Sequence, residues 1–258
     1  MASLKAIVFD CDGVIAETER DGHRVAFNRA FQEKGINAEW SVEEYAGLVR
    51  VAGGKERMKA YFSQHPELLP PKVSVDDCIA DLHKVKTHIF MEMSASGELP
   101  IRSGIQRIVA EARRAKMLLA ICSTSNEKSV KSLVRALLGK SSLEWFAGIF
   151  AGDVVSRKKP APDVYNIVKE QFSLAGEDCI VIEDTRNGLE AAKAAGMKCV
   201  VTTSFYSVDE GFTEADLVVS ALGDPGLPPI RILQGNTALP DAFPYVSLDH
   251  LKNLVDGG

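Results

Sequence analysis

The composition of the chain is typical of a globular protein and excludes several classes of function. It has 258 residues, 46% of them hydrophobic and 25% charged, with a formal net charge of −5. This length is enough for one large domain, or for one domain that carries a smaller insertion. The mild negative charge argues against a general nucleic-acid-binding protein, and no apolar run in the sequence is long enough to span a membrane. We therefore expect neither nucleic acid nor a membrane as a partner.

The five cysteines indicate free thiols. They lie far apart, without a CxxC pair, at positions 11, 78, 122, 179 and 199. An odd number at such spacing is typical of reduced thiols in an intracellular compartment, and not of a disulfide framework or a zinc site. Because a strand-like segment begins at Leu4, we expect no signal or transit peptide within this sequence.

The first predicted element is a buried strand, followed by a helix. LKAIVF, residues 4–9, is a continuous apolar run, as in a strand covered on both faces of a parallel sheet. Residues 18–34 have the apolar spacing of a helix, and Gly35 is a natural C-terminal stop.

Only helices are predicted from there to about Met93. SVEE, residues 41–44, is a capping box that begins a short second helix. Two further helical patterns, over residues 53–62 and 75–93, lie on either side of a proline-rich break at residues 65–73.

Strand and helix patterns alternate in the second half of the chain. Further helices are predicted over residues 104–115, 127–138, 162–171 and 187–195. Strands are predicted over residues 117–122, 148–152, 179–184, 198–203 and 216–221. Such alternation implies a parallel sheet with helices on both faces, to which the first strand also belongs.

The fold class that follows is α/β: a doubly wound, parallel-sheet core with a small helical cap inserted after the first strand. We expect residues 1–17 and 97–258 to form the core and residues 18–96 to form the cap. The segment rich in proline and glycine at residues 223–244, with a short helix at residues 247–255, is predicted to wrap the core.

Polar side chains gather at one edge of this predicted sheet. They follow separate strands or lie in a loop between sheet elements: Asp10 and Asp12, Ser123, Lys159, and Glu183 with Asp184. In α/β sheets, ligands bind at the carboxyl ends of the strands. Each pattern alone also fits a loop, a helix cap or a turn, but all of them in this order favour a site.

The residue types in this group suit phosphate chemistry. A cluster of carboxylates needs a cation, and oxygen ligands without histidine or cysteine favour Mg²⁺. A carboxylate can act as a nucleophile and form an aspartyl-phosphate, while a second one moves the proton. Ser123 and Lys159 are suited to hold the phosphoryl oxygens, on which negative charge is concentrated.

Four segments resemble the motifs of the haloacid-dehalogenase-like phosphohydrolases, in the same order: FDCDGV, ICSTSN, KKPAPDVY and VIEDTRNGLEAAKAAGM. The helical insertion resembles the cap of the beta-phosphoglucomutase-like subgroup. By that resemblance Asp10 is the nucleophile and Asp12 the general acid and base. Ser123 and Lys159 hold the phosphoryl group.

The same resemblance implies a magnesium site. Asp10, the backbone carbonyl of Asp12 and Asp184 hold the ion, and Glu183 supports these ligands. Cys11 occupies a variable position between the two aspartates, and we expect no catalytic part for it.

The cap is expected to select the substrate. Its candidate binding residues are Glu17, His23, Arg50, Gly53, Gly54, Lys55 and Lys86, to which Ser123 and Asn126 of the core are added. In RVAGGK, two glycines beside cationic residues allow backbone N–H groups to approach an anion. A cationic cap and a phosphoryl site on the core suit a substrate with phosphates at both ends. Glu17 is expected to accept hydrogen bonds from sugar hydroxyls.

DCDGVIAETERDGHRVAFN and GGKERM are similar to the CbbY-like branch of this subgroup. That resemblance implies hydrolysis of xylulose 1,5-bisphosphate, an inhibitor of Rubisco, to xylulose 5-phosphate and phosphate. The C-terminal LPDAFPYVSLDHL is similar to plant members, which implies the chloroplast stroma; a bacterial protein would be cytoplasmic. We expect a monomer.

Three alternatives stay open. A sugar-phosphate mutase uses the same two aspartates, although the AETE stretch after them differs from the sequence usual in the mutase. Another sugar-phosphate phosphatase would share the whole core site. A non-catalytic binding protein on this fold is disfavoured by the complete set of acids, hydroxyl and lysine.

Overall fold

The computed structural model describes residues 3–51, 53–71, 73–235 and 242–256. The chain divides into two compact units, one formed by Met1–Glu17 with Pro100–Gly258 and the other by Thr18–Leu99. We call them the core unit and the helical unit.

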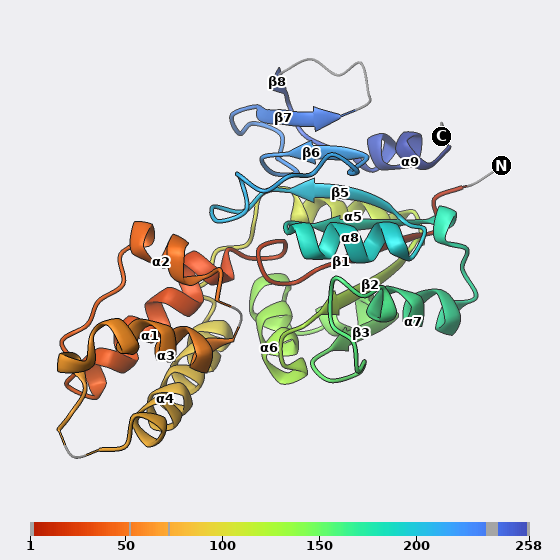
Figure 1. The fold of residues 1–258 in the computed structure, drawn as a ribbon. Helices are drawn as coiled ribbons and strands as arrows, with labels where there is room; N and C mark the ends of the chain where they lie inside the picture. The colour runs from red at the N-terminus through yellow and green to blue at the C-terminus, as the bar shows by residue number, and fades with distance from the viewer. Residues whose placement is uncertain (1–2, 52, 72, 236–241, 257–258) are drawn as a thin grey trace. The chain divides into compact units, whose positions relative to one another are not determined.

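The core unit is built on a mixed, mostly parallel sheet, which confirms the predicted α/β class (Figure 1). Among the described residues the strands are β1 (Ala6–Phe9), β2 (Leu118–Ser123), β3 (Gly148–Ala151), β4 (Cys179–Glu183), β5 (Lys198–Thr202), β6 (Leu217–Val219), β7 (Ile230–Gly235) and β8 (Ala242–Phe243). Their order is β3-β2-β1-β4-β5-β6-β7-β8. Pairing is parallel from β3 through β6 and antiparallel from β6 to β8.

Helices cover both faces of this sheet. They are α5 (Ile105–Arg114), α6 (Glu127–Leu138), α7 (Asp163–Phe172), α8 (Arg186–Ala194) and α9 (Leu248–Asp256), with short 3₁₀ helices at Ser142–Trp145 and Gly176–Asp178. α7 and α8 contact each other over small strand residues such as Ala6, Ala120 and Cys199. α5 and α9 form another contacting pair. Small side chains on the strands let helix and sheet pack closely, which makes the core rigid beneath the strand ends.

The prediction of a C-terminal wrap at residues 223–244 is wrong where the structure describes it. β7 and β8 are antiparallel strands that extend the sheet beyond β6 (Figure 1). In IRILQG of β7, buried or half-buried residues alternate with exposed ones, which is the period of a strand with one covered face. The proline and glycine around this short pattern hid it in the sequence. Residues 236–241 of the predicted wrap lie outside the described residues.

The helical unit contains α1 (Arg24–Glu33), α2 (Val42–Leu48), α3 (Gly54–Gln64) and α4 (Val75–Ser96), with a π-helical turn at Glu19–His23 and a 3₁₀ turn at Pro66–Leu68. The predicted capping box is confirmed, because the Ser41 side chain accepts from Glu44 N and the Glu44 side chain accepts from Ser41 N. The helix predicted over residues 18–34 is confirmed, with a π-helical stretch at Glu19–His23 before α1.

Aromatic side chains form the centre of the helical unit. Five of them are buried: Phe27, Phe31, Trp40, Tyr45 and Phe62. Phe27 contacts Trp40 and Tyr45, and Phe31 contacts Trp40 and Phe62, with ring centroids 4.8–6.4 Å apart. Each large aromatic side chain removes a large apolar surface from water, so this group contributes strongly to the stability of the unit. In the described part of the chain, no helix combines the length and the apolar character needed to cross a membrane.

Candidate active site

Three adjacent parallel strands bring the predicted site residues of the core unit together. Phe9 of β1 pairs with Ile121 of β2 on one side and with Ile182 of β4 on the other. Asp10 and Glu183 are the next residues along their strands, and Asp10 N donates to the Ile182 carbonyl at 2.9 Å. The two carboxylates therefore meet at the carboxyl edge of the sheet, where ligands bind in this class of fold.

Lys159 is the cation between these carboxylates. Its Nζ lies 2.5 Å from Asp10 Oδ1 and 2.6 Å from Glu183 Oε1, and it also donates to the Cys122 carbonyl at 3.0 Å. Burial acts to lower the lysine pKa, but the two carboxylates outweigh burial and raise the pKa above its ordinary value. Lys159 therefore stays charged in a buried site.

Burial and the neighbouring carboxylates disfavour the ionised form of Asp10 and Asp184. Burial raises the pKa of Asp10 from 3.8 to about 8; Lys159 opposes the shift, while Glu183 and Asp12 add to it. Burial, together with Glu183 and Asp10, also raises the pKa of Asp184 well above its ordinary value. Burial and mutual repulsion thus favour the protonated form of both carboxyls when no further cation is present.

The donor set fits a divalent metal ion. Carboxylate oxygens of Asp10, Glu183 and Asp184 lie within 4.8 Å of one another, and all three residues are buried. Asp184 Oδ1 is buried and has no hydrogen-bond partner among the described residues, so it has an unused lone pair. A hard, all-oxygen set of this kind could bind a divalent cation such as Mg²⁺.

Glu183 differs from the other two carboxylates because protein donors already surround it. Its Oε1 accepts from Lys159 and from the buried Tyr165 hydroxyl at 2.7 Å, and its Oε2 accepts from Asp184 N at 3.0 Å. A carboxylate with its lone pairs in use is better suited to orient its neighbours than to bind a metal directly.

Gly13 permits a close approach to Asp184. Its φ is +77°, and a Cβ at this position would lie 2.0 Å from Asp184 Oδ2. Gly13 is thus required both by its left-handed backbone and by the space that the carboxylate takes. The turn after Asp12 therefore packs directly against the acidic cluster formed by Asp10, Glu183 and Asp184.

Asp12 lies outside that cluster and contacts hydroxyl groups. Its Oδ2 accepts from Ser125 Oγ at 2.5 Å and from Ser123 Oγ at 3.4 Å. Ser125 had no role in the sequence analysis, although the spacing of two serines after a strand was the available signal. The side chains of Asp12 and Asp10 therefore contact different groups, hydroxyls for Asp12 and Lys159 for Asp10.

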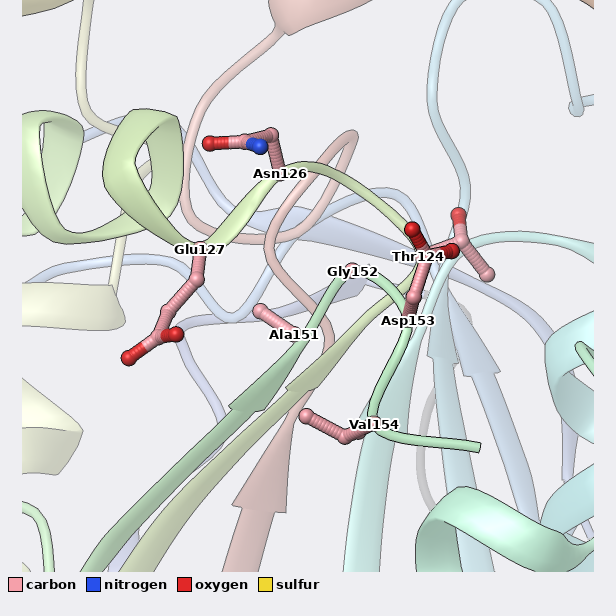
Figure 2. A pocket seen from close by; sticks show the side chains of 7 residues that line it. All are labelled: Thr124, Asn126, Glu127, Ala151, Gly152, Asp153 and Val154. Atoms are coloured by element: carbon pink, nitrogen blue, oxygen red, sulfur yellow. The ribbon is translucent and has the colours of Figure 1, made fainter. Parts of the chain in front are cut away.

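Asn126 begins α6. Its Oδ1 accepts from Lys128 N at 2.9 Å, which is a helix N-cap. It also lines a cavity of about 390 Å³ with six other residues from the end of β2, the start of α6 and the end of β3: Thr124, Glu127, Ala151, Gly152, Asp153 and Val154 (Figure 2). The acidic cluster contributes no residue to this lining.

Two predicted binding residues of the helical unit are in contact. His23 Nδ1 lies 2.9 Å from Lys86 Nζ, and the lysine is buried between the rings of Phe27 and Phe90. Nearby, burial and the charges of Lys86 and Lys55 lower the pKa of His83, and a Cβ at Gly54 would lie 3.2 Å from the His83 ring. Lys86 is therefore a buried cation held by aromatic faces.

Arg50, Gly53, Gly54 and Lys55 lie in the loop before α3 and in its first turn. Gly53 has a φ of +91°, which favours glycine, while Arg50 and Lys55 are exposed. Ala52 of this loop is outside the described residues. Glu17, the remaining candidate, is the last residue of the first segment of the core unit.

Arg57 is a further residue of the helical unit that the sequence analysis did not find. It is buried on α3, and its guanidinium donates to the carbonyls of Val49 and Val51 at 3.4 Å and to Tyr45 Oη. It therefore holds the loop that carries Arg50. Backbone carbonyl partners leave no signal in a sequence.

Comparison with known proteins identifies the family. Residues 4–196 match the model of the haloacid dehalogenase-like hydrolases. A CBBY-like protein of Arabidopsis thaliana is 47% identical over 223 residues, which are 85% of this chain and 70% of that protein. Protein CbbY of Cereibacter sphaeroides is 40% identical over 86% of this chain and 94% of its own length.

The chain belongs to the CbbY-like family of haloacid dehalogenase-like hydrolases. It is a phosphatase of this family, so the resemblance stated from the four motifs is confirmed. A solved structure of a CbbY variant from Rhodobacter sphaeroides in complex with xylulose 1,5-bisphosphate has a TM-score of 0.71 and 40% identity. The two structures align over 84% of this chain and 94% of the CbbY chain. A beta-phosphoglucomutase-type structure from Thermotoga maritima, 23% identical with a TM-score of 0.64, shares the fold.

Proposed function

We propose that this chain is a Mg²⁺-dependent phosphatase that hydrolyses xylulose 1,5-bisphosphate to xylulose 5-phosphate and phosphate. The observation that carries the proposal is the buried Asp10–Lys159–Glu183 group beside Asp184, in a chain 40% identical to a CbbY whose structure contains xylulose 1,5-bisphosphate. Its similarity to a plant relative supports the chloroplast stroma as its location and removal of a Rubisco inhibitor as its role.

The first half of the proposed reaction is attack by Asp10. A carboxylate oxygen of Asp10 forms a bond to phosphorus while the bond from phosphorus to the sugar oxygen breaks. Asp12 gives its proton to the departing sugar oxygen. Ser123 and Lys159 bind the phosphoryl oxygens, where negative charge develops.

The second half removes the phosphoryl group from Asp10. Asp12, now ionised, takes a proton from water, and the water oxygen bonds to phosphorus as the Asp10–phosphorus bond breaks. Ser125 holds the Asp12 side chain for both transfers. Mg²⁺, held by Asp10, Asp184 and the Asp12 carbonyl with support from Glu183, would neutralise negative charge on the phosphoryl group.

Specificity is assigned to the helical unit. We propose that Arg50, the Gly53–Lys55 segment and the His23–Lys86 pair bind the second phosphate and the sugar, with Glu17 as an acceptor for sugar hydroxyls. The support is chemical: backbone N–H groups beside glycines, together with lysine and arginine, bind phosphate. Asn126 is proposed to assist Ser123 on the core side.

A phosphate-release panel tests the proposal. We expect release from xylulose 1,5-bisphosphate to exceed that from xylulose 5-phosphate and glucose 6-phosphate, to stop with EDTA and to return with Mg²⁺. Asp10→Asn should abolish it. Equal rates on bisphosphate and monophosphates would contradict the substrate, and isomerisation of a sugar phosphate without phosphate release would indicate a mutase.

A further inference from the structure

Arg102 binds an unusual number of backbone carbonyls in the core unit. Its Nη1 donates to Gly13 O and, at 2.9 Å, to Thr202 O. Its Nη2 donates to Thr203 O at 2.7 Å and to Ser220 O at 3.1 Å. One guanidinium thus joins the turn after Asp12 to the ends of β5 and β6.

The geometry explains why arginine stands here. Carbonyl groups at the ends of parallel strands run out of ladder partners, and each needs a donor. The planar guanidinium has five N–H groups fixed in a fork, whereas a lysine has three donors on one atom and cannot reach carbonyls in several directions at once.

Gly13 connects this arginine to the acidic cluster. The N–H of the Asp12–Gly13 peptide donates to Ala16 O at 2.8 Å, and the next peptide carbonyl is bound by Arg102. The Gly13 N–H and the Asp12 C=O belong to one trans peptide and point in opposite directions, so the bond to Ala16 sets the direction of the Asp12 carbonyl. Arg102 holds the next peptide and so restricts rotation at Gly13. The α-carbon of Gly13 lies directly against the Asp184 carboxylate.

We propose that Arg102 is a positioning residue of the phosphatase site: it holds the Asp12–Gly13 turn so that the Asp12 carbonyl and Asp184 converge on one cation. The proposal rests on the magnesium site of the proposed function. It adds a residue that binds the backbone of Gly13 and whose positive charge also acts on the Asp184 carboxylate.

Arg107 provides a matched control in the same unit. It also binds backbone carbonyls, of Gly223 at 2.6 Å and Val246 at 2.8 Å, and it forms an ion pair with Asp224. Its partners are in the C-terminal segment and at Glu111 of α5, and none of them lies in the turn after Asp12. Loss of either arginine should destabilise the core, but only loss of Arg102 should disturb the cation site.

The test compares Arg102→Lys and Arg107→Lys with the wild type in two measurements. The first is the Mg²⁺ concentration for half-maximal hydrolysis of p-nitrophenyl phosphate; the second is the rise in melting temperature on adding Mg²⁺, which needs no turnover. We expect Arg102→Lys to raise the half-maximal concentration about tenfold, as loss of about 1.4 kcal/mol would, and to reduce the melting shift. Arg107→Lys should lower the melting temperature and leave both Mg²⁺ responses unchanged.

If the lysine variant does not fold, Arg102→Gln is compared with Arg102→Met: both remove the charge that acts on Asp184, and only glutamine keeps two N–H donors, so a smaller change in the glutamine variant supports the proposal. Unchanged Mg²⁺ responses in a folded Arg102 variant, or equal changes in the Arg107 control, would overturn the proposal. If Mg²⁺ raises the melting temperature of the wild type but the wild type does not hydrolyse xylulose 1,5-bisphosphate, the proposed substrate is contradicted. The role of Arg102 at the cation site would still stand.

Discussion

The Tyr165 hydroxyl and Lys159 donate to the same carboxylate oxygen of Glu183. Tyr165 is fully buried on α7, and its Oη donates to Glu183 Oε1 at 2.7 Å, the oxygen that also accepts from Lys159. Without this hydroxyl, Glu183 would draw the lysine more strongly, at the expense of its contact with Asp10. Phenylalanine fills the same space, so a single substitution separates the hydrogen bond from the packing.

We predict that Tyr165→Phe lowers kcat by about threefold to tenfold, since one hydrogen bond of this kind contributes about 1 kcal/mol. The melting temperature should change little. Steady-state kinetics and thermal unfolding measure the two effects, and Tyr61→Phe in the helical unit is the control. A kcat equal to that of the wild type would show that Lys159 does not depend on Tyr165.

At the scale of elements, α3 positions the loop that precedes it. Arg57, from the second turn of α3, donates to the carbonyls of Val49 and Val51 on both sides of Arg50. Glu19 and Tyr45, which contact the same guanidinium, hold it in place. The loop that we propose to bind the second phosphate is therefore braced from within the helical unit.

Arg57→Lys should raise KM for xylulose 1,5-bisphosphate by about three- to tenfold, because a looser loop loses part of its binding energy. Hydrolysis of p-nitrophenyl phosphate, which has no second phosphate, should be unchanged. Lys59→Gln on the same helix removes only the exposed ion pair with Asp76 and should be neutral. An equal loss on both substrates would assign Arg57 to the stability of the unit instead.

At the scale of the whole molecule, the order of strands and helices and the acidic residues at the strand ends could be predicted from the sequence. Alternating elements specify a parallel sheet, and adjacent strand ends imply that Asp10, Glu183 and Asp184 meet, as they do. Arg102 escaped prediction because its partners are backbone carbonyls of residues far along the chain. β7 and β8 escaped because the period-two pattern of β7 is short and lies among proline and glycine, and because their pairing depends on the edge of β6.

The folded protein should release protons when it binds Mg²⁺. Burial, with the neighbouring carboxylates, raises the pKa of Asp10 to about 8 and that of Asp184 well above its ordinary value. In the unfolded chain these groups ionise near pH 3.8. Between pH 3.8 and about 8 the metal-free folded state therefore holds more protons than the unfolded state, so this cluster makes a contribution to stability that falls as pH rises.

Mg²⁺ reverses this trend because it binds the ionised carboxylates and displaces their protons. We predict that the Mg²⁺-induced rise in melting temperature grows from pH 6 to pH 8, and that calorimetric binding enthalpies differ between buffers with different ionisation enthalpies. Asp184→Asn, which removes one charge and one ligand oxygen, should weaken both effects. A melting shift that is the same at every pH would mean that the cluster is already ionised before the cation binds.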